Sequence, residues 1–270
     1  MTLRPVRTVI VGASGRMGTQ LLQALPLFPD LTLIGAVASE HSAALGRGAA
    51  AANVGAVPIT GSLPPLLEQA DVVLDFSSAS AAAAHLAACV AAHVPLLLGT
   101  SGLPRELTAP LTAAAEKIAL LVAPNTSPGV TVLLELTRQA AQALPAGYDI
   151  EILETHHRDK VDAPSGTALA LGEAAAQGRG VRLSEQASFG RHGHTGARGV
   201  SQIGFGALRG GDVVGEHQIW FLGDGERVLL QHSATDRAVF ARGALLAARW
   251  LADRPPGRYA MKDVFMSSFK

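Results

Sequence analysis

The first half of the chain alternates short apolar runs with longer alanine- and leucine-rich segments. The apolar runs contain no polar alternation, which is typical of strands that are buried on both faces of a sheet. These expected strands cover residues 8–11, 31–37, 72–76, 95–99 and 118–124. The expected helices between them cover residues 16–25, 78–93 and 104–117. Strands that alternate with helices in this way predict an α/β fold with a Rossmann-like, doubly wound parallel sheet.

After Pro124 the pattern of apolar and polar positions changes. Residues 148–155 alternate as a half-exposed strand does, and residues 201–234 contain three such runs joined by RGGD and GDGE turns. Turns of this kind between alternating runs predict an antiparallel meander. The expected helices of this half cover residues 129–144, 165–177 and 238–252. A glycine-, arginine- and histidine-rich loop is expected over residues 178–199.

The change of pattern predicts two domains. We expect a dinucleotide-binding domain over residues 1–127 and a second, α+β domain with a mostly antiparallel sheet over residues 128–240. A length of 270 residues is compatible with two cores of moderate size.

Three glycines stand between the first expected strand and the first expected helix, in the sequence VIVGASGRMG. Gly12 would form the tight turn, Gly15 would let backbone N–H groups approach a pyrophosphate, and Gly18 would let the helix pack on the strand. The N-terminus of the helix would favour the phosphates. The G-x-x-G-x-x-G spacing is not the commoner G-x-G-x-x-G, and an ordinary glycine turn is the alternative. Its place in a βαβ unit predicts dinucleotide binding.

The end of the second expected strand should carry an acid that binds the ribose. Ser39 stands near that position, and Glu40 follows it. An acid would favour NAD, whereas a serine with Arg16 nearby would admit the 2′-phosphate of NADP, so the preference stays open. Two later loops, over residues 99–102 and 123–129, carry small, hydroxyl- and amide-bearing residues that suit a nicotinamide and its ribose.

The densest polar stretch is ETHHRDKVDAPSGTA, residues 154–168. A metal site on His156, His157 and Asp159 is one interpretation, but no metal-ligand spacing supports it. A solvated loop is another. The third is a site for a small dianion, in which His156 supplies a proton, Lys160 binds a carboxylate or shares in proton delivery, and the N–H groups that open the next helix hold a second carboxylate.

Composition limits the classes of partner. Lys+Arg and Asp+Glu are both 22, so the chain lacks the basic excess that is usual in nucleic-acid binding proteins. The longest apolar stretch is interrupted by His85, His93 and Pro95, which argues against a membrane span. Cys89 is the single cysteine, so no disulfide forms within the chain, and a cytoplasmic location is expected.

Several motifs together resemble those of the dihydrodipicolinate reductase family. They are GASGRMG (12–18), GTSG (99–102), APNTSPGV (123–130), ETHHRDKVDAPSGTALALGE (154–173), RHGHTGAR (191–198), IGFGALRGGDVVGEH (203–217) and GERVLLQHSATDR (225–237). The resemblance covers nearly the whole chain, and the segment over 154–173 is the most specific part of it.

The resemblance implies an oxidoreductase of lysine and diaminopimelate biosynthesis. It would reduce a cyclic imine dicarboxylate with NADH or NADPH, without a metal, and form a homotetramer through the sheet of the second domain. The resemblance also implies that residues 241–270 pack back onto the first domain. Hydride would go to C4 of the substrate ring and a proton to C3.

The resemblance also implies site residues. The cofactor would lie against Gly12, Ala13, Ser14, Gly15, Arg16, Met17, Ser39, Gly99, Thr100, Ser101, Ala123, Pro124, Asn125 and Thr126. His156 would be the proton donor and Lys160 the second acid–base residue. The substrate would be bound by His157, Ser165, Gly166 and Thr167.

The chain departs from the family pattern at three places. Many members have an acid where Ser39 stands, so we expect use of both NADH and NADPH. Asp159 stands where a histidine is frequent, and we expect it to tune the segment rather than act chemically. The loop over residues 178–193 is short for the family.

Two other functions are weighed against the reductase. An aldehyde or semialdehyde dehydrogenase needs a cysteine nucleophile in its substrate domain, and Cys89 lies in an alanine-rich helix of the first domain. A cofactor-sensing regulator would bind the dinucleotide without turnover and would not need His156 or Lys160.

Overall fold

The computed structural model describes residues 4–51 and 54–266. The chain divides into two compact units: unit 1 comprises Met1–Pro128 with Ala238–Lys270, and unit 2 comprises Gly129–Arg237. None of the described helices combines the length and the apolar character needed to cross a membrane.

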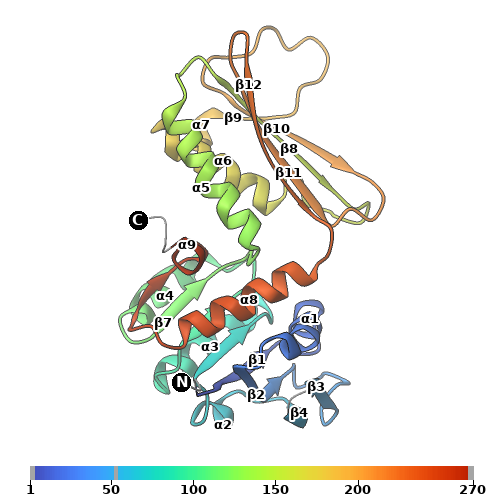
Figure 1. Cartoon of the computed structure of the whole chain (residues 1–270), viewed down its shortest axis with the longest axis vertical. Coiled ribbons are helices and arrows are strands. Elements are labelled where there is room, and N and C mark those ends of the chain that lie inside the picture. The colour runs from blue at the N-terminus through green and yellow to red at the C-terminus, as the bar shows by residue number, and fades with distance from the viewer. Residues whose placement is uncertain (1–3, 52–53, 267–270) are drawn as a thin grey trace. The chain divides into compact units, whose positions relative to one another are not determined.

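Unit 1 is built on an eight-stranded sheet (Figure 1). From one edge to the other, its strands are β13 (Gly257–Tyr259), β7 (Ala119–Val122), β6 (Leu96–Leu98), β5 (Val72–Asp75), β1 (Val6–Val11), β2 (Leu31–Val37), β4 (Val54–Thr60) and β3 (Gly48–Ala51). Every pair of neighbours is parallel except β3 and β4. The chain order reverses at β1, which lies between β2 and β5, and this reversal places the ligand-binding edge of such a sheet.

Helices cover both faces of this sheet. One apolar core joins the sheet to α1 (Arg16–Ala24), α8 (Ala238–Leu251) and α9 (Met261–Phe265). The other core joins it to α2 (Pro64–Leu67), α3 (Ala79–Ala91) and α4 (Thr108–Ala115). Two 3-10 turns, η1 (Leu25–Leu27) and η2 (Arg105–Leu107), complete the unit.

Strand β1 shows why this half of the sequence reads as unbroken apolar runs. Ile10 packs into the first core, whereas Val9 and Val11 pack into the second. Since successive residues of a strand point to opposite faces, a strand covered on both sides needs apolar residues at every position. The expected doubly wound parallel sheet is confirmed.

Unit 2 contains a five-stranded sheet and three helices. The strands lie in the order β12 (Arg227–Ala234), β11 (Gly215–Leu222), β8 (Asp149–His156), β10 (Ile203–Arg209) and β9 (Ala187–Phe189). The helices α5 (Pro128–Ala143), α6 (Gly166–Arg179) and α7 (Leu183–Gln186) share one apolar core with one face of the sheet (Figure 1).

The meander expected over residues 201–234 is only half correct. Strands β11 and β12 form the expected antiparallel hairpin, but β10 pairs in parallel with β8, which lies between β10 and β11. The backbone N–H groups of His157 and Arg158, just after β8, donate to the carbonyls of Val213 and Gly211. Because these carbonyls bind the end of β8, the glycine-rich connection cannot close a hairpin between β10 and β11.

The second sheet is mostly antiparallel when its paired residues are considered. The antiparallel ladders of β11 with β12 and with β8 run along nearly whole strands, and the parallel pairing is that of β10, which pairs with β8 along its length and with β9 over a short ladder. The segment 178–199, expected to be a loop, contains α7 and the short edge strand β9. Strand β13, near the end of the chain, pairs with β7 at the edge of the unit 1 sheet.

Candidate active site

The glycine fingerprint lies at the carboxyl end of β1. Gly12 has a φ of +83°, and a Cβ there would lie 2.5 Å from the backbone oxygen of Phe76. A Cβ on Gly18 would lie 2.2 Å from the backbone oxygen of Gly12, and the N–H of Gly15 donates to that same oxygen at 2.9 Å. Glycine is therefore required at both ends of the turn, for conformation at Gly12 and for helix–strand contact at Gly18.

The N-terminus of α1 is open to a ligand. Its N-cap residue is Gly15, and no side chain caps the first turn. Ser14, Gly15 and Arg16 are exposed, whereas Ala13 is buried and Met17 packs partly against the core. Backbone N–H groups at such an end favour phosphate oxygens, so these residues fit the pyrophosphate of a dinucleotide.

The residues after β2 lie beside the same turn. Ser39 and Glu40 are exposed, and the Oγ atom of Ser39 accepts a hydrogen bond from the N–H of His41 at 3.4 Å. The hydroxyls of Ser14 and Ser42 are 3.3 Å apart and link the two loops. Ser39 therefore lies in the loop at the carboxyl end of β2, next to the turn that carries the glycine fingerprint.

The loops after β6 and β7 lie at the same edge of the sheet, because both strands run parallel to β1. Gly99 is buried under the ring of Phe76, which a Cβ on Gly99 would approach to 2.1 Å. The buried Thr100 hydroxyl donates to the carbonyl of Asp75 at 3.5 Å, and Ser101 is exposed.

The loop after β7 is held by its own side chains. Ala123 is buried and Pro124 is exposed. The Oδ1 atom of Asn125 accepts a backbone N–H two residues further on at 2.9 Å. The hydroxyl of Thr126 donates to the carbonyl of Phe240 at 2.7 Å, which ties this loop to the start of α8.

A buried acid at the end of β5 was missed in the sequence analysis. Asp75 has no exposed surface, and its carboxylate accepts hydrogen bonds from the N–H and hydroxyl of Ser77 at 2.9 and 2.5 Å. The Nδ1 atom of His85 on α3 lies 2.8 Å from the same carboxylate. The signal for it in the sequence was an acid at the end of an otherwise apolar strand. These bonds fix the loop that follows β5 beside Gly12.

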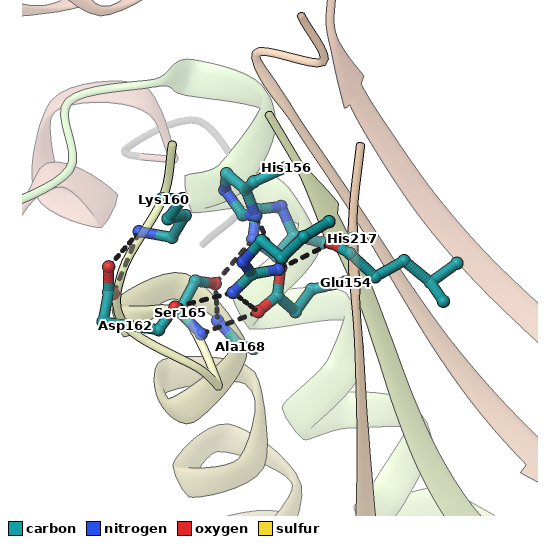
Figure 2. A network of polar contacts seen from close by, with 9 residues as sticks. Glu154, His156, Lys160, Asp162, Ser165, Ala168 and His217 are labelled. Atoms are coloured by element: carbon teal, nitrogen blue, oxygen red, sulfur yellow. Dashed lines mark hydrogen bonds and ion pairs between the residues drawn. The ribbon is translucent and has the colours of Figure 1, made fainter. Parts of the chain in front are cut away.

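In unit 2, strand β8 brings an acid and a histidine to the same face. Its residues alternate between half-buried and buried, so Glu154 and His156 both point toward the core, at 0% and 9% exposure. The Nδ1 atom of His156 lies 2.5 Å from Oε2 of Glu154 (Figure 2).

Arg209 neutralises that buried acid. It pairs opposite His156 in the β8–β10 register, and its Nη1 and Nη2 atoms donate to the two oxygens of Glu154 at 2.8 and 2.7 Å. The N–H of Ser165 donates to Oε1 of Glu154 at 3.0 Å. A bidentate guanidinium contact of this kind is among the strongest ion pairs that proteins form.

The start of α6 closes the cluster. Ser165 is the N-cap, and its Oγ atom accepts the N–H of Ala168 at 3.1 Å and lies 3.0 Å from Nε2 of His217 (Figure 2). The rings of His217 and His156 meet edge to face with centroids 5.1 Å apart. Gly166 and Thr167 are the first two residues of α6, at the positive end of its dipole.

Lys160 lies in the segment that joins β8 to α6. Its Nζ atom contacts both oxygens of Asp162, at 2.7 and 2.9 Å. Its N–H donates to the carbonyl of His157, and Asp159 is exposed. Among the described residues, no three His, Cys, Asp or Glu side chains gather as a metal site would require.

The charges in this cluster follow from burial and contact. Burial lowers the pKa of His156 below its ordinary value, and the hydrogen bond to Glu154 opposes that shift. Burial alone would raise the pKa of Glu154, but the hydrogen bonds from Arg209 and His156 bring it below its ordinary value. Burial lowers the pKa of His217 to about 4. Near pH 7, Glu154 is therefore ionised and His217 is neutral.

Of the residues that the sequence singled out in this unit, His156 and Ser165 are members of one hydrogen-bonded cluster with Glu154, and Lys160 is close enough to lower the pKa of His156. Sequence reasoning assigned no role to Glu154, Arg209 or His217. All three lie inside the quoted motifs, at 154–173 and 203–217, and that membership was the only signal available.

Comparisons of this chain with family models and with individual proteins agree with one another. The family model described as "Dihydrodipicolinate reductase, N-terminus" matches residues 6–126, and the one described as "Dihydrodipicolinate reductase, C-terminus" matches residues 129–265. A 4-hydroxy-tetrahydrodipicolinate reductase of Anaeromyxobacter dehalogenans strain 2CP-1 is 47% identical over 261 residues, which is 96% of this chain and 97% of that protein. One of Myxococcus xanthus strain DK1622 is 47% identical over 264 residues, with 96% and 97% covered.

Among solved structures, a dipicolinate-bound dihydrodipicolinate reductase from Paenisporosarcina sp. TG-14 matches with a TM-score of 0.75 at 24% identity. The match covers 95% of this chain and 97% of that one. At this identity the likeness shows a shared fold.

Proposed function

Since the chain belongs to the dihydrodipicolinate reductase family, whose members are oxidoreductases of lysine and diaminopimelate biosynthesis, we propose that His156 and Lys160 supply the acid–base chemistry of its reaction. The reaction reduces 4-hydroxy-tetrahydrodipicolinate, by way of dihydrodipicolinate, to tetrahydrodipicolinate with NADH or NADPH. The observation that carries the proposal is the buried cluster of Glu154, His156 and Ser165 beside Lys160, at the N-terminus of α6.

The substrate carboxylates would be bound by three groups of unit 2. Lys160 offers an ammonium, and the N–H groups of Gly166 and Thr167 lie in the first turn of α6, where the helix dipole favours an anion. His157 follows β8 directly and offers a further ring N–H. Lys160 contacts the carboxylate of Asp162, and a substrate carboxylate would take the place of Asp162 as its partner.

When bound, the reduced nicotinamide supplies a hydride for C4 of the conjugated ring. The electron pair of the ring then moves toward C3, and His156 donates a proton there. Burial is the chief cause that lowers the pKa of His156 below its ordinary value. The two negative charges of the bound dicarboxylate favour the protonated ring, so substrate binding itself prepares the acid.

We propose that the residues of unit 1 bind the dinucleotide and that the reaction uses no metal. The uncapped N-terminus of α1 leaves backbone N–H groups for phosphate oxygens, and the close backbone contacts at Gly12 and Gly18 hold that N-terminus against the end of β1. Ser39 carries no negative charge to repel a 2′-phosphate, and Arg16 is exposed beside the same turn. We therefore propose that both NADH and NADPH are used.

A homotetramer is the proposed assembly. The face of the unit 2 sheet that points away from α5 and α6 carries Leu153, Trp220 and the exposed Leu229 among polar residues. Apolar side chains on a sheet face that is rimmed by polar residues are typical of a protein–protein interface, and a second copy of the same face could cover them. We further propose a cytoplasmic enzyme without nucleic-acid or membrane partners, in keeping with a net charge of zero and one buried cysteine.

The test is nicotinamide oxidation by the purified protein, with substrate made in situ from pyruvate and aspartate semialdehyde by the preceding synthase. Turnover should require the synthase product, and H156A should lose most of it while still binding the cofactor. A folded protein that binds NADH and NADPH but oxidises neither would contradict the substrate assignment.

A further inference from the structure

The register of three strands builds the surroundings of His156. Glu154 and His156 are two residues apart on β8 and so share a face. His217 of β11 lies opposite Glu154, and Arg209 of β10 lies opposite His156. Residues far apart in the chain are thus placed around one buried carboxylate by backbone pairing alone.

Among the residues that the structure describes, the hydrogen-bond partners of the Glu154 carboxylate all lie in unit 2. Oε1 accepts from Nη2 of Arg209 at 2.7 Å and from the N–H of Ser165 at 3.0 Å. Oε2 accepts from Nη1 of Arg209 at 2.8 Å and contacts Nδ1 of His156 at 2.5 Å. A buried carboxylate held by a bidentate guanidinium stays ionised and has no proton to give.

The contact with an ionised carboxylate determines which nitrogen of His156 carries the proton. A carboxylate only accepts hydrogen bonds, so Nδ1 of His156 must be the donor in both the neutral and the charged ring. Proton exchange is then left to Nε2. A Cβ on Gly215 would lie 3.0 Å from Nε2, so the glycine leaves space beside this atom.

We propose that Glu154 is a positioning residue for the reaction: held by Arg209, it fixes the Nδ1–H form of His156 and assigns proton transfer to Nε2. This inference rests on the proposed function, in which His156 is the acid. The groups that face His156 are Glu154 on its own strand, Arg209 on β10, His217 on β11 and Lys160 in the segment before α6. Glu154 is the one among them that stabilises the protonated ring.

The first test needs no substitution and no turnover. Nitrogen-15 NMR of the wild-type protein, with the His156 signals assigned by their loss in H156N, reports which ring nitrogen is protonated in the neutral form. The proton should be on Nδ1. Neutral His156 with its proton on Nε2 would overturn the proposal, whatever the enzyme's activity.

The second test compares E154Q with a matched control, E151Q. Glu151 lies on the same strand and is also paired with arginines, Arg191 and Arg198, but it faces away from His156. E154Q should lower kcat on the order of 10²-fold, as expected for loss of general-acid function, and should shift the NMR pKa of His156 downward. E154D, which keeps the charge, should restore part of kcat.

A purely structural ion pair predicts a different result. In that case E154Q would lower the melting temperature but would leave the pKa of His156 and the shape of the pH–kcat profile as in E151Q. That outcome would overturn the proposal. A shifted His156 pKa in E154Q, with no synthase-dependent turnover in the wild type, would instead contradict the proposed function and leave the positioning of His156 intact.

Discussion

Gly18 joins the turn after β1 to the first turn of α1 so closely that no side chain fits between them. A Cβ at this position would lie 2.2 Å from the carbonyl oxygen of Gly12 and 2.6 Å from Cα of Ala13. Both neighbours are backbone, so neither can rotate away. The close approach is what brings the N–H groups of α1 to the place where a pyrophosphate would bind.

We predict that G18A loses cofactor binding and stability together. The backbone must shift to accommodate the alanine Cβ, which should lower the free energy of unfolding by about 2–3 kcal/mol and Tm by roughly 5–10 °C. Fluorescence titration with NADH and thermal unfolding measure the two effects. G147A, at a glycine with open space around it, should change neither. Normal NADH affinity in G18A would contradict the role assigned to this contact.

The buried, neutral ring of His217 leads us to predict that the folded protein becomes less stable in acid. Its folded pKa is about 4, below an ordinary value of 6.5, so the unfolded chain binds the extra proton first. The free energy that neutral His217 contributes to folding is fully present above about pH 6.5. As the pH falls toward 4, the free energy of unfolding decreases by up to about 3 kcal/mol.

Urea unfolding at several pH values between 7 and 4 measures this loss. The slope of stability against pH should be smaller in H217Q, which has no titrating ring, than in the wild type. Equal slopes in the two proteins would show that His217 is not buried in its neutral form.

At the residue scale, the sequence indicated His156 and Lys160 because acid–base residues stood out in a stretch of small residues. It did not indicate Arg209, which is 55 positions from Glu154 and reaches it only through the pairing of β10 with β8. A contact that depends on sheet register cannot be read from local spacing.

At the scale of elements, the periodicity of the chain predicted most of unit 1. The second strand was expected over the residues that β2 occupies, and α1 and α8 begin at their expected residues. Strands covered on both faces give long apolar runs, which are a strong signal. The error over β10 and β11 arose because turn residues report a reversal of the chain but not which strand lies beside it.

The loop after β2 carries the prediction on cofactor choice. A negative charge at Ser39 would repel a 2′-phosphate and attract ribose hydroxyls. We expect S39D to lower kcat/KM for NADPH about tenfold relative to that for NADH, equivalent to ~1.4 kcal/mol. A43D, which puts the same charge on an exposed residue of the same loop, should change the ratio little. If the ratio of kcat/KM for NADPH to that for NADH were unchanged in S39D, the ribose would have to bind away from residue 39.

At the scale of the whole molecule, the outer face of the unit 2 sheet should decide the oligomeric state. Trp220 lies on β11, an inner strand of this sheet. A charged side chain in place of Trp220 should prevent the face from being buried against another copy. We expect W220E to elute as smaller species in size-exclusion chromatography with light scattering. L27E, at an exposed leucine of unit 1, should elute as the wild type does. If W220E still formed a tetramer, the interface would have to lie on another surface.

The pairing of β13 with β7 has a consequence for how the protein is made. Unit 2 is one continuous stretch, so a nascent chain can complete it while the ribosome still holds the last part of the sequence. Unit 1 must wait, because α8 and β13 come from that last part. During synthesis the half that would bind the dicarboxylate is therefore finished before the half that would bind the nucleotide, although the latter begins first.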